Sequence, residues 1–265
     1  MLEIARYEAE KRLKGTAALT AGIAVLSLLF VGFFPSLEGA DVDFDAVLDA
    51  YPPAVQEAFG IATLSTIEGF LAVEIYQFVW LLLLGLYFAY SAGGLIAGDV
   101  ERDRMDLVLS LPVSRSRVLL EKFLSLLAPI LALNLVVPLV VSLGVFAIGQ
   151  SIDPLDLAMV HLLSIPYLLA CATIGLVLSV LVDRADVAKR IAIALVFVLF
   201  LVESIAASTE GLEWVGYASP THYYDPTAIL VEGTYDLAGA AVLLVAVCVL
   251  FLLGRLRFSR ADIGA

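Results

Sequence analysis

The sequence has few of the residues on which common active sites depend. It contains two histidines, His161 and His222, and neither has a partner at metal-ligand spacing, such as H-x-x-x-H or H-E-x-x-H. The G-x-S-x-G turn of serine hydrolases is absent, as is a G-x-x-x-x-G-K-[ST] loop for nucleotide phosphates. We therefore expect a chain that is not itself an enzyme and that binds no cofactor or metal, with both histidines as interfacial polar residues.

Cysteine is equally scarce. The two cysteines, Cys171 and Cys248, both fall inside long apolar runs. A disulfide framework or a cysteine metal site is therefore not expected, and both side chains are interpreted as small apolar groups.

Apolar residues are abundant and are grouped. Hydrophobic residues make up 62% of the 265-residue chain, and the mean hydropathy is +1.00, whereas soluble domains are about 45–50% apolar. Crossing a bilayer takes roughly 20 mostly apolar residues in a helix. Six runs meet this requirement: 16–35, 74–97, 118–149, 157–182, 190–207 and 236–254. The sequence predicts an all-α, polytopic membrane protein, with the third span kinked at Pro129 or Pro138.

Basic residues are missing from three of the five segments that connect the apolar runs. The 15 Lys and Arg residues fall before the first run, around the start of the third, around the start of the fifth and after the sixth. Segments 36–73, 150–156 and 208–235 contain none. Because cytoplasmic loops carry the excess of Lys and Arg, we expect a protein of the cell membrane with both termini and segment 98–123 in the cytoplasm.

The acidic excess lies mostly in the segments that lack cations. The net charge is −12, which argues against a nucleic-acid partner, since such a partner requires a basic face. Arg outnumbers Lys by 11 to 4. Together with the acidic loops, this suggests a high-salt habitat, because salt screens self-repulsion. Undiminished stability near 0.1 M salt would contradict that hypothesis.

The segment GDVERDRMDLVLSLPVSRSRVLLEKF, residues 98–123, is a charged stretch with long apolar runs on both sides. Its acidic first half suits a helix N-terminus, and Pro112 is expected to end that helix. Ser114 or Ser116 can cap the next one. The residues Arg115, Arg117 and Lys122 would then lie at the inner membrane surface. The alternative is an amphipathic loop that contacts only lipid headgroups.

Two polar residues inside apolar runs are candidates for a transport pathway. Asn134 lies deep in the third run, and Glu203 lies near the outer end of the fifth. Asn134 could instead bond across helices, and Glu203 could reach the headgroups. A series of buried Asp, Glu and His residues, typical of proton-coupled pumps, is missing, so the chain shows no energy source of its own.

The stretch ERDRMDLVLSLPVSRSRVLLEKF resembles the segment between the second and third spans of type-2 ABC exporter permeases, above all those of nitrous-oxide-reductase maturation and of multidrug or sodium export. The matching positions are Glu101, Leu107 to Leu111, Pro112, Val113, Ser114, Arg115 and Lys122. Arg104-Met105 stands where the family often has Gly-Thr. The segment SPTHYYDPTAILVEG resembles the region before the last span. The charged N-terminal helix and the six-span layout extend the likeness over nearly the whole chain.

The resemblance implies that segment 98–116 is a coupling helix docked on a separate ATPase, which binds ATP and magnesium. Two permeases and two ATPases would form the working unit, so a second copy of this chain is an expected partner besides lipid. Leu107, Leu109 and Leu111 would give apolar contact beside Pro112. The charged residues of the coupling site would be Asp99, Glu101, Arg102, Asp103, Arg104, Asp106, Arg115 and Lys122.

The resemblance also divides the single domain, residues 1–265. Residues 1–15 would be an amphipathic helix on the inner membrane face, where Glu8–Arg12 and Glu10–Lys14 have the spacing of surface pairs. Segment 208–235 would contain re-entrant helices on the outer side, with Tyr217, Tyr223 and Tyr224 at the membrane interface. A belt of aromatic residues without any re-entrant helix is the alternative.

We therefore expect the permease subunit of an ATP-driven exporter. A secondary transporter, which would need no ATP, and a non-transporting scaffold remain as alternatives. A membrane-embedded hydrolase is disfavoured because no catalytic groups converge in the apolar runs.

Overall fold

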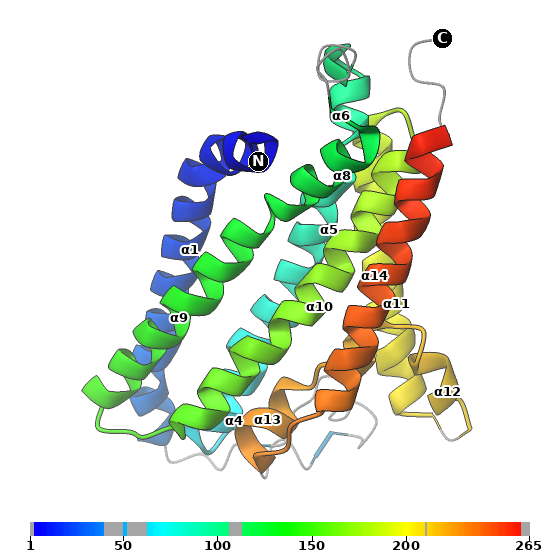
Figure 1. Cartoon of the computed structure of the whole chain (residues 1–265). Helices are drawn as coiled ribbons and strands as arrows, with labels where there is room; N and C mark the ends of the chain where they lie inside the picture. The colour runs from blue at the N-terminus through cyan, green and yellow to red at the C-terminus, as the bar shows by residue number, and fades with distance from the viewer. Residues whose placement is uncertain (1–2, 40–49, 52–62, 106–112, 210, 261–265) are drawn as a thin grey trace.

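The computed structural model describes residues 3–39, 50–51, 63–105, 113–209 and 211–260, which form helices and connecting turns without a strand. Six helical segments are long and apolar enough to cross a membrane, and Figure 1 shows them as a bundle. They are Glu3–Glu38, Ile67–Val100, Arg115–Ala147, Pro154–Leu181, Ala185–Ala207 and Leu237–Arg260. The predicted all-α fold with six spans is confirmed.

The first span is a single helix, α1 (Glu3–Glu38), which includes the expected amphipathic segment. Figure 1 shows that its first turns bend away from the rest of α1 and lie across the end of the bundle. The apolar part begins after Lys14, where charged residues give way to a run that is suited to lipid.

The second span is built from consecutive helical pieces. They are α4 (Ile67–Leu71), the π-helix η1 (Ala72–Leu84), α5 (Gly85–Gly93) and the short α6 (Ala97–Val100). The span starts at Ile67 because the Thr66 hydroxyl accepts a hydrogen bond from the Gly69 N–H. Hydropathy alone placed the start at residue 74, within η1.

The third span is broken near its beginning. It consists of α8 (Arg115–Leu124) and α9 (Leu127–Ala147), and Ser114 caps α8 by accepting from the Arg117 N–H. The break falls at Ser125 because Pro129 has no N–H for the Ser125 carbonyl and its ring crowds that carbonyl. The expected kink and the Ser114 cap are both confirmed.

The fourth and fifth spans are α10 (Pro154–Leu181) and α11 (Ala185–Ala207). Three short helices follow: α12 (Glu213–Gly216), the 3₁₀ helix η2 (Pro220–Tyr223) and α13 (Pro226–Glu232). The sixth span is α14 (Leu237–Arg260). Asp225 caps α13 and Gly233 ends it at a φ of +64°, so PTAILVEG is a helix that a proline opens.

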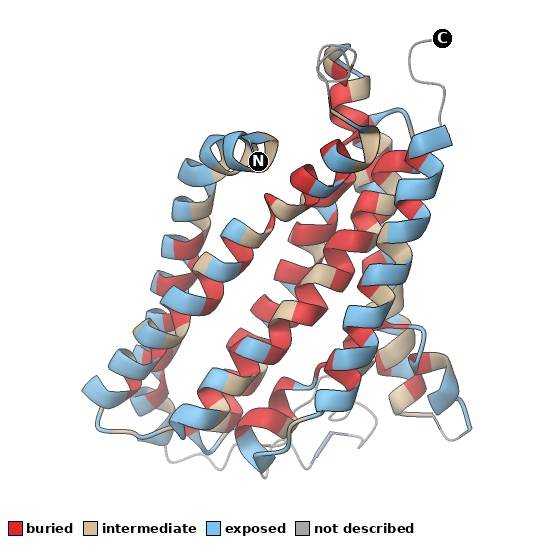
Figure 2. Ribbon diagram, in the orientation of Figure 1, coloured by how far each residue is buried: buried red, intermediate tan, exposed pale blue. Residues whose placement is uncertain are grey.

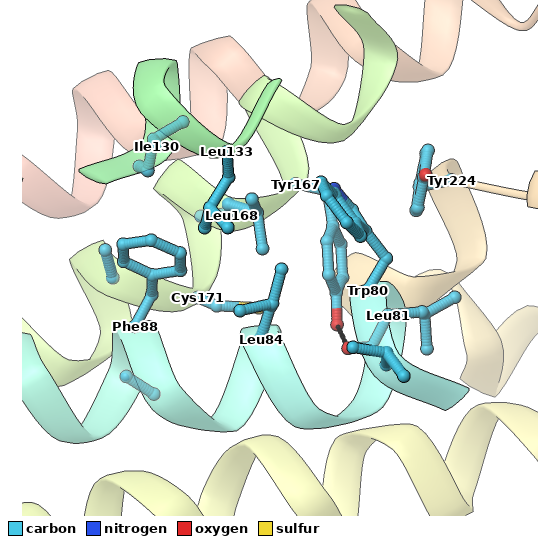
Figure 3. Close-up of a cluster of buried hydrophobic side chains, with 14 of the residues drawn as sticks. Trp80, Leu81, Leu84, Phe88, Ile130, Leu133, Tyr167, Leu168, Cys171 and Tyr224 are labelled. Carbon is cyan, nitrogen blue, oxygen red and sulfur yellow. Dashed lines mark hydrogen bonds between the residues drawn. The ribbon is translucent and has the colours of Figure 1, made fainter. Parts of the chain in front are cut away.

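α10 lies at the centre of the bundle and packs against α5, α9, α11 and α14. Figure 2 shows that its residues are mostly buried, whereas the outer faces of α1, α9 and α14 are exposed. Figure 3 shows the core beside α10, where the Tyr167 hydroxyl donates to the Leu81 carbonyl at 2.6 Å. This bond fixes α10 to the π-helical η1.

Tyr224 belongs to this core and not to an aromatic belt. Its ring stacks on Tyr167 at 5.4 Å between centroids, and its hydroxyl donates to the Val160 carbonyl at 3.0 Å. Only 2% of Tyr224 is exposed, while Tyr217 is 59% exposed. The segment before the last span therefore closes one end of the bundle through contacts with α10, η1 and α4.

The other end of the bundle carries the positive charge. Figure 1 places the start of α1, α6, the start of α8 and the end of α14 at one end, and α12 and α13 at the other. All 15 basic residues belong to segments at the first end. The cation-bearing segments that the sequence assigned to one side of the membrane therefore do lie together.

Candidate functional site

A cluster of charged side chains joins α1, α8 and the segment after α5 at the basic end of the bundle. The Lys122 Nζ on α8 lies 2.5 Å from the Asp99 Oδ2 on α6 and 3.0 Å from the Glu8 Oε1 on α1. Its side chain is only 3% exposed. We call Glu8, Asp99, Arg104 and Lys122 the basal ion-pair cluster. An ammonium group in this position is stable only because two carboxylates surround it.

The segment after α5 is fastened to the bundle at several points. The second carboxylate oxygen of Asp99 lies 2.8 Å from an Arg104 guanidinium nitrogen. The Glu101 Oε2 accepts from the Ala185 N–H at 3.1 Å, at the start of α11. The N–H groups of Ile96 and Ala97 both donate to the Ser179 hydroxyl on α10. Residues 96–104 therefore have bonded contacts to α8, α10 and α11.

Glu121 caps the beginning of α1. Its Oε2 accepts from the backbone N–H groups of Ile4 at 2.9 Å and Ala5 at 3.2 Å, and its Oε1 accepts from the Arg117 Nε at 2.7 Å. The first N–H groups of a helix have no partner within the helix and favour negative charge. The buried Glu121 therefore anchors the start of α1 on α8.

The structure separates the predicted coupling residues into groups. Asp99, Arg104 and Lys122 meet in the basal ion-pair cluster, whereas Glu101, Arg102 and Asp103 are exposed. Arg115 donates to the Phe258 carbonyl at the end of α14 at 3.4 Å. The remaining predicted residues lie outside the described part of the chain: Asp106, Leu107, Leu109, Leu111 and Pro112.

The ion pairs expected within the N-terminal helix are replaced by others. Glu8 binds Lys122 on another helix, 114 positions away, instead of Arg12. Glu10 binds Arg6 at 2.7 Å instead of Lys14. The Glu8 carboxylate faces α8, where it pairs with the buried Lys122 ammonium, and charges shielded from water attract each other more strongly.

A second polar group lies deep in the bundle, around the predicted pathway residue Asn134. Its Oδ1 lies 3.1 Å from the His161 Nδ1 and accepts from the Ser164 hydroxyl at 2.8 Å. The His161 Nε2 lies 3.0 Å from the Tyr76 hydroxyl, and the Trp80 indole N–H donates to Ser164 at 3.1 Å. This network, Tyr76, Trp80, Asn134, His161 and Ser164, joins η1, α9 and α10.

If the His161 imidazole is neutral, the hydrogen bonds of this network determine which of its two ring nitrogens carries the proton. Asn134 Nδ2 donates to the Ile130 carbonyl at 2.9 Å, so the oxygen faces His161. Because that oxygen only accepts, the His161 Nδ1 carries the proton and the Nε2 accepts from Tyr76. Asn134 thus bonds across helices, as one of the two sequence interpretations expected. The network also borders an apolar groove of about 550 Å³ between α9 and α10.

Glu203 lies in a different place, beside the short helices. Its Oε1 is 3.9 Å from the Nδ1 of His222, whose ring packs edge-on between Tyr217 and Tyr223. Glu203 therefore contacts the helices that close the far end of the bundle. The two predicted pathway residues lie on different helices, Asn134 on α9 and Glu203 on α11, and a role in transport stays a prediction for both.

Several residues of these clusters had no signal in the sequence. Glu8 and Glu121 read as ordinary surface carboxylates, and Tyr76 and Trp80 read as span residues. A partial signal exists, because Tyr76 and Trp80 are four apart and His161 and Ser164 are three apart, so each pair lies on one helix face. The sequence does not show which helix faces pack against each other, because that depends on the tertiary fold.

The whole chain was compared with known proteins. The family model described as ABC-2 family transporter protein matches residues 2–263, while a comparison with curated proteins gives no match. The match covers all six spans, the basal ion-pair cluster, the Asn134 network and the short helices before α14. The chain is thus a multi-pass membrane protein that belongs to the ABC-2 transporter family.

Proposed function

We propose that this chain is the permease subunit of an ATP-driven exporter and that a separate ATPase chain binds and hydrolyses ATP with magnesium. Family membership supports the permease role. The observation that favours a coupled partner is the basal ion-pair cluster, which ties the base of segment 98–116 to α1 and α8, together with the Glu101 bond that ties it to α11.

This arrangement suits the transmission of force. A partner that moved segment 98–116 would pull on the Lys122 ion pairs with Asp99 and Glu8, and thereby on α8 and α1. The Glu101 bond to Ala185 would carry the same movement to α11. Packed helices with few voids pass such displacements on, because they are difficult to compress.

The exposed residues of the same segment are available for contact with the proposed ATPase. Arg102 and Asp103 make no ion pair within the described residues and are open to solvent. Charges at the rim of an interface govern encounter and selectivity. We propose that they steer the ATPase, that the working unit contains two copies of each chain, and that the basic end faces the cytoplasm.

A secondary transporter is the main alternative, and the Asn134 network is the observation that favours it. In this network both ring nitrogens of His161 are already engaged in hydrogen bonds, with Tyr76 and with Asn134. Driving transport by an ion gradient would need carboxylates along a path, and none of the five residues of this network is a carboxylate.

Purification of the tagged chain from its own membranes in mild detergent tests the proposal. A nucleotide-binding protein that co-purifies in a near-equal molar amount, and an ATP hydrolysis rate that changes when the pair is placed in liposomes, would support it. Recovery of the chain alone, together with solute flux that follows a sodium or proton gradient and ignores ATP, would contradict it.

A further inference from the structure

A polar cavity of about 130 Å³ lies next to the basal ion-pair cluster, between α1, residues 94–104, α8 and α11. Two carboxylates line it, Glu8 and Asp99, against six basic side chains. The basic residues are Lys11, Arg12, Arg102, Arg104, Lys122 and Lys189. The lining therefore has an excess of four positive charges, six against two.

The two carboxylates are already engaged. Asp99 binds Lys122 and Arg104, and Glu8 binds Lys122. Among the described residues, neither carboxylate forms an ion pair with Arg12. The positive charge of the rest of the lining is thus not balanced by carboxylates of the described part of the chain.

Two donors in the lining are both buried and unused. The Nε atoms of Arg12 and Arg104 are shielded from solvent, and neither has a hydrogen-bond partner in the described residues. Leaving a buried donor without an acceptor is unfavourable, and more so when the donor is charged. Two guanidinium groups at one cavity offer the planar, forked donors that suit the oxygens of a phosphate group.

The position of the cavity in the bundle further limits which ligands could bind. It lies where the charged start of α1 meets the apolar part of the same helix, so it is at the level of the lipid headgroups if α1 spans the membrane. The negatively charged leaflet attracts basic residues at this level. A volume of 130 Å³ has room for a phosphate group but not for a whole nucleotide or lipid.

We propose that this cavity is a binding site for a phosphate group, either the headgroup phosphate of an anionic phospholipid or a soluble phosphate. The bound oxygens accept from the Arg12 and Arg104 Nε atoms, while Lys11 and Lys189 supply further positive charge. Binding links the start of α1 to segment 94–104 and to α11. The site rests on the cavity and its charges, and it stands whether or not an ATPase binds this chain.

The test uses the purified full-length protein in a neutral detergent at constant ionic strength. Three probes are titrated: dioctanoyl phosphatidylglycerol, dioctanoyl phosphatidylcholine and inorganic phosphate. Binding is followed by native mass spectrometry and by the thermal unfolding midpoint. Arg12→Gln removes one lining guanidinium, and Lys14→Gln removes an equal charge from the same helix outside the cavity.

Wild type and Lys14→Gln are expected to bind one phosphatidylglycerol, while Arg12→Gln binds it at least about tenfold more weakly. Lys11→Gln, in which the replaced side chain is exposed, gives a smaller loss in the same direction and serves if Arg12→Gln does not fold. Phosphate that binds as tightly as phosphatidylglycerol, with the same loss in Arg12→Gln, supports the site and identifies a soluble ligand. Equal binding of phosphatidylcholine and phosphatidylglycerol, equal affinity in Arg12→Gln and Lys14→Gln, or no binding of any probe overturns the proposal.

Discussion

Lys122 is a buried lysine whose charge is balanced by residues from two other helices. Replacing it with Met keeps the length of the side chain but leaves Asp99 and Glu8 without their ammonium partner. Removing one member of a buried ion pair costs about 3–5 kcal/mol. We expect Lys122→Met to lower the free energy of unfolding by about 3 kcal/mol, measured by denaturation in mixed micelles.

Lys14→Met is the matched control for this change, since Lys14 is exposed on α1, and we expect it to stay within about 0.5 kcal/mol of wild type. Adding Asp99→Asn to Lys122→Met removes one of the two stranded carboxylates, so the double variant is expected to be more stable than the sum of the single changes. A Lys122→Met protein as stable as wild type would show that the cluster does not hold α8 and α1 together.

The Asn134 network makes a separate prediction at this scale. Asn134→Leu removes the acceptor for both the His161 ring and the Ser164 hydroxyl. Interhelical hydrogen bonds in membranes average about 0.6 kcal/mol, and an orphaned buried donor costs about 1–3 kcal/mol. We expect Asn134→Leu to lower the free energy of unfolding by about 1–2 kcal/mol, whereas Ser142→Ala, at an exposed position of α9, changes it little.

A substitution at His161 distinguishes a structural network from a pathway. If the network only holds η1, α9 and α10 together, His161→Gln keeps a donor and an acceptor and restores most of the stability that His161→Phe loses. Any transport activity would then follow stability in both variants. Normal stability with abolished transport in His161→Gln would instead place His161 on the substrate path.

Sequence patterns revealed little at the residue scale, and the reason is distance along the chain. Glu8 and Lys122 are 114 positions apart and Tyr76 and His161 are 85 apart. Local charge spacing favoured Glu8–Arg12, which is a pair that any isolated helix could form. The polarity of Asn134 could be noticed inside an apolar run, but its partners depend on which helix faces meet.

At the scale of single elements, α5 and α10 lie very close together. A Cβ added at Gly175 would overlap the backbone carbonyl oxygen of Ala89 and approach the Gly93 nitrogen at 3.0 Å. Gly85, Ala89 and Gly93 follow at intervals of four on the facing side of α5, which is the small-residue spacing that lets membrane helices come close. The second and fourth spans therefore pack backbone to backbone.

We expect Gly175→Ala to lower the free energy of unfolding by about 1–3 kcal/mol, because α5 and α10 must separate to admit one methyl group. Gly22→Ala on α1 is the control, since a Cβ there meets nothing within 4 Å, and alanine generally favours a helix by about 0.5–1 kcal/mol. Thermal unfolding of the two variants in the same detergent measures the difference. Equal midpoints would contradict the close α5–α10 crossing.

Elements were the part of the structure that sequence predicted best. Runs of apolar residues give the spans because the bilayer core accepts little else, and Pro129 gives the break at Ser125 because its ring prevents one backbone bond. The π-helical register of Ala72–Leu84 could not be predicted. Its side chains are as apolar as those of an α-helical span, so the sequence does not distinguish the two kinds of helix.

At the scale of the whole molecule, the distribution of charge predicts the orientation. The basic segments meet at one end of the bundle, and cytoplasmic segments are those rich in Lys and Arg. In a Cys248→Ser background, we expect a cysteine at Ser259 to react with a membrane-impermeant maleimide only after the membrane is opened. A cysteine at Ser151, at the other end, is expected to react in intact cells.

The reverse labelling pattern would place the basic end outside and would rule out contact between segment 98–116 and a cytoplasmic ATPase. The sidedness of the charges could be predicted from the sequence because it depends only on the order of spans and loops. Adaptation to high salt, suggested by the net charge of −12, stays a prediction, since no contact among the described residues bears on it.

The most direct test of the central claim is photocrosslinking from Arg102, which is exposed at the base of segment 98–116. A photoreactive amino acid at this position, in the chain expressed in its own membranes, is predicted to capture an ATP-binding protein. The same probe at Ser151, at the opposite end of the bundle, is predicted to capture none. If the Arg102 probe captures only lipid or a second copy of this chain, while the protein remains active in transport, the account of an ATPase-coupled permease is contradicted.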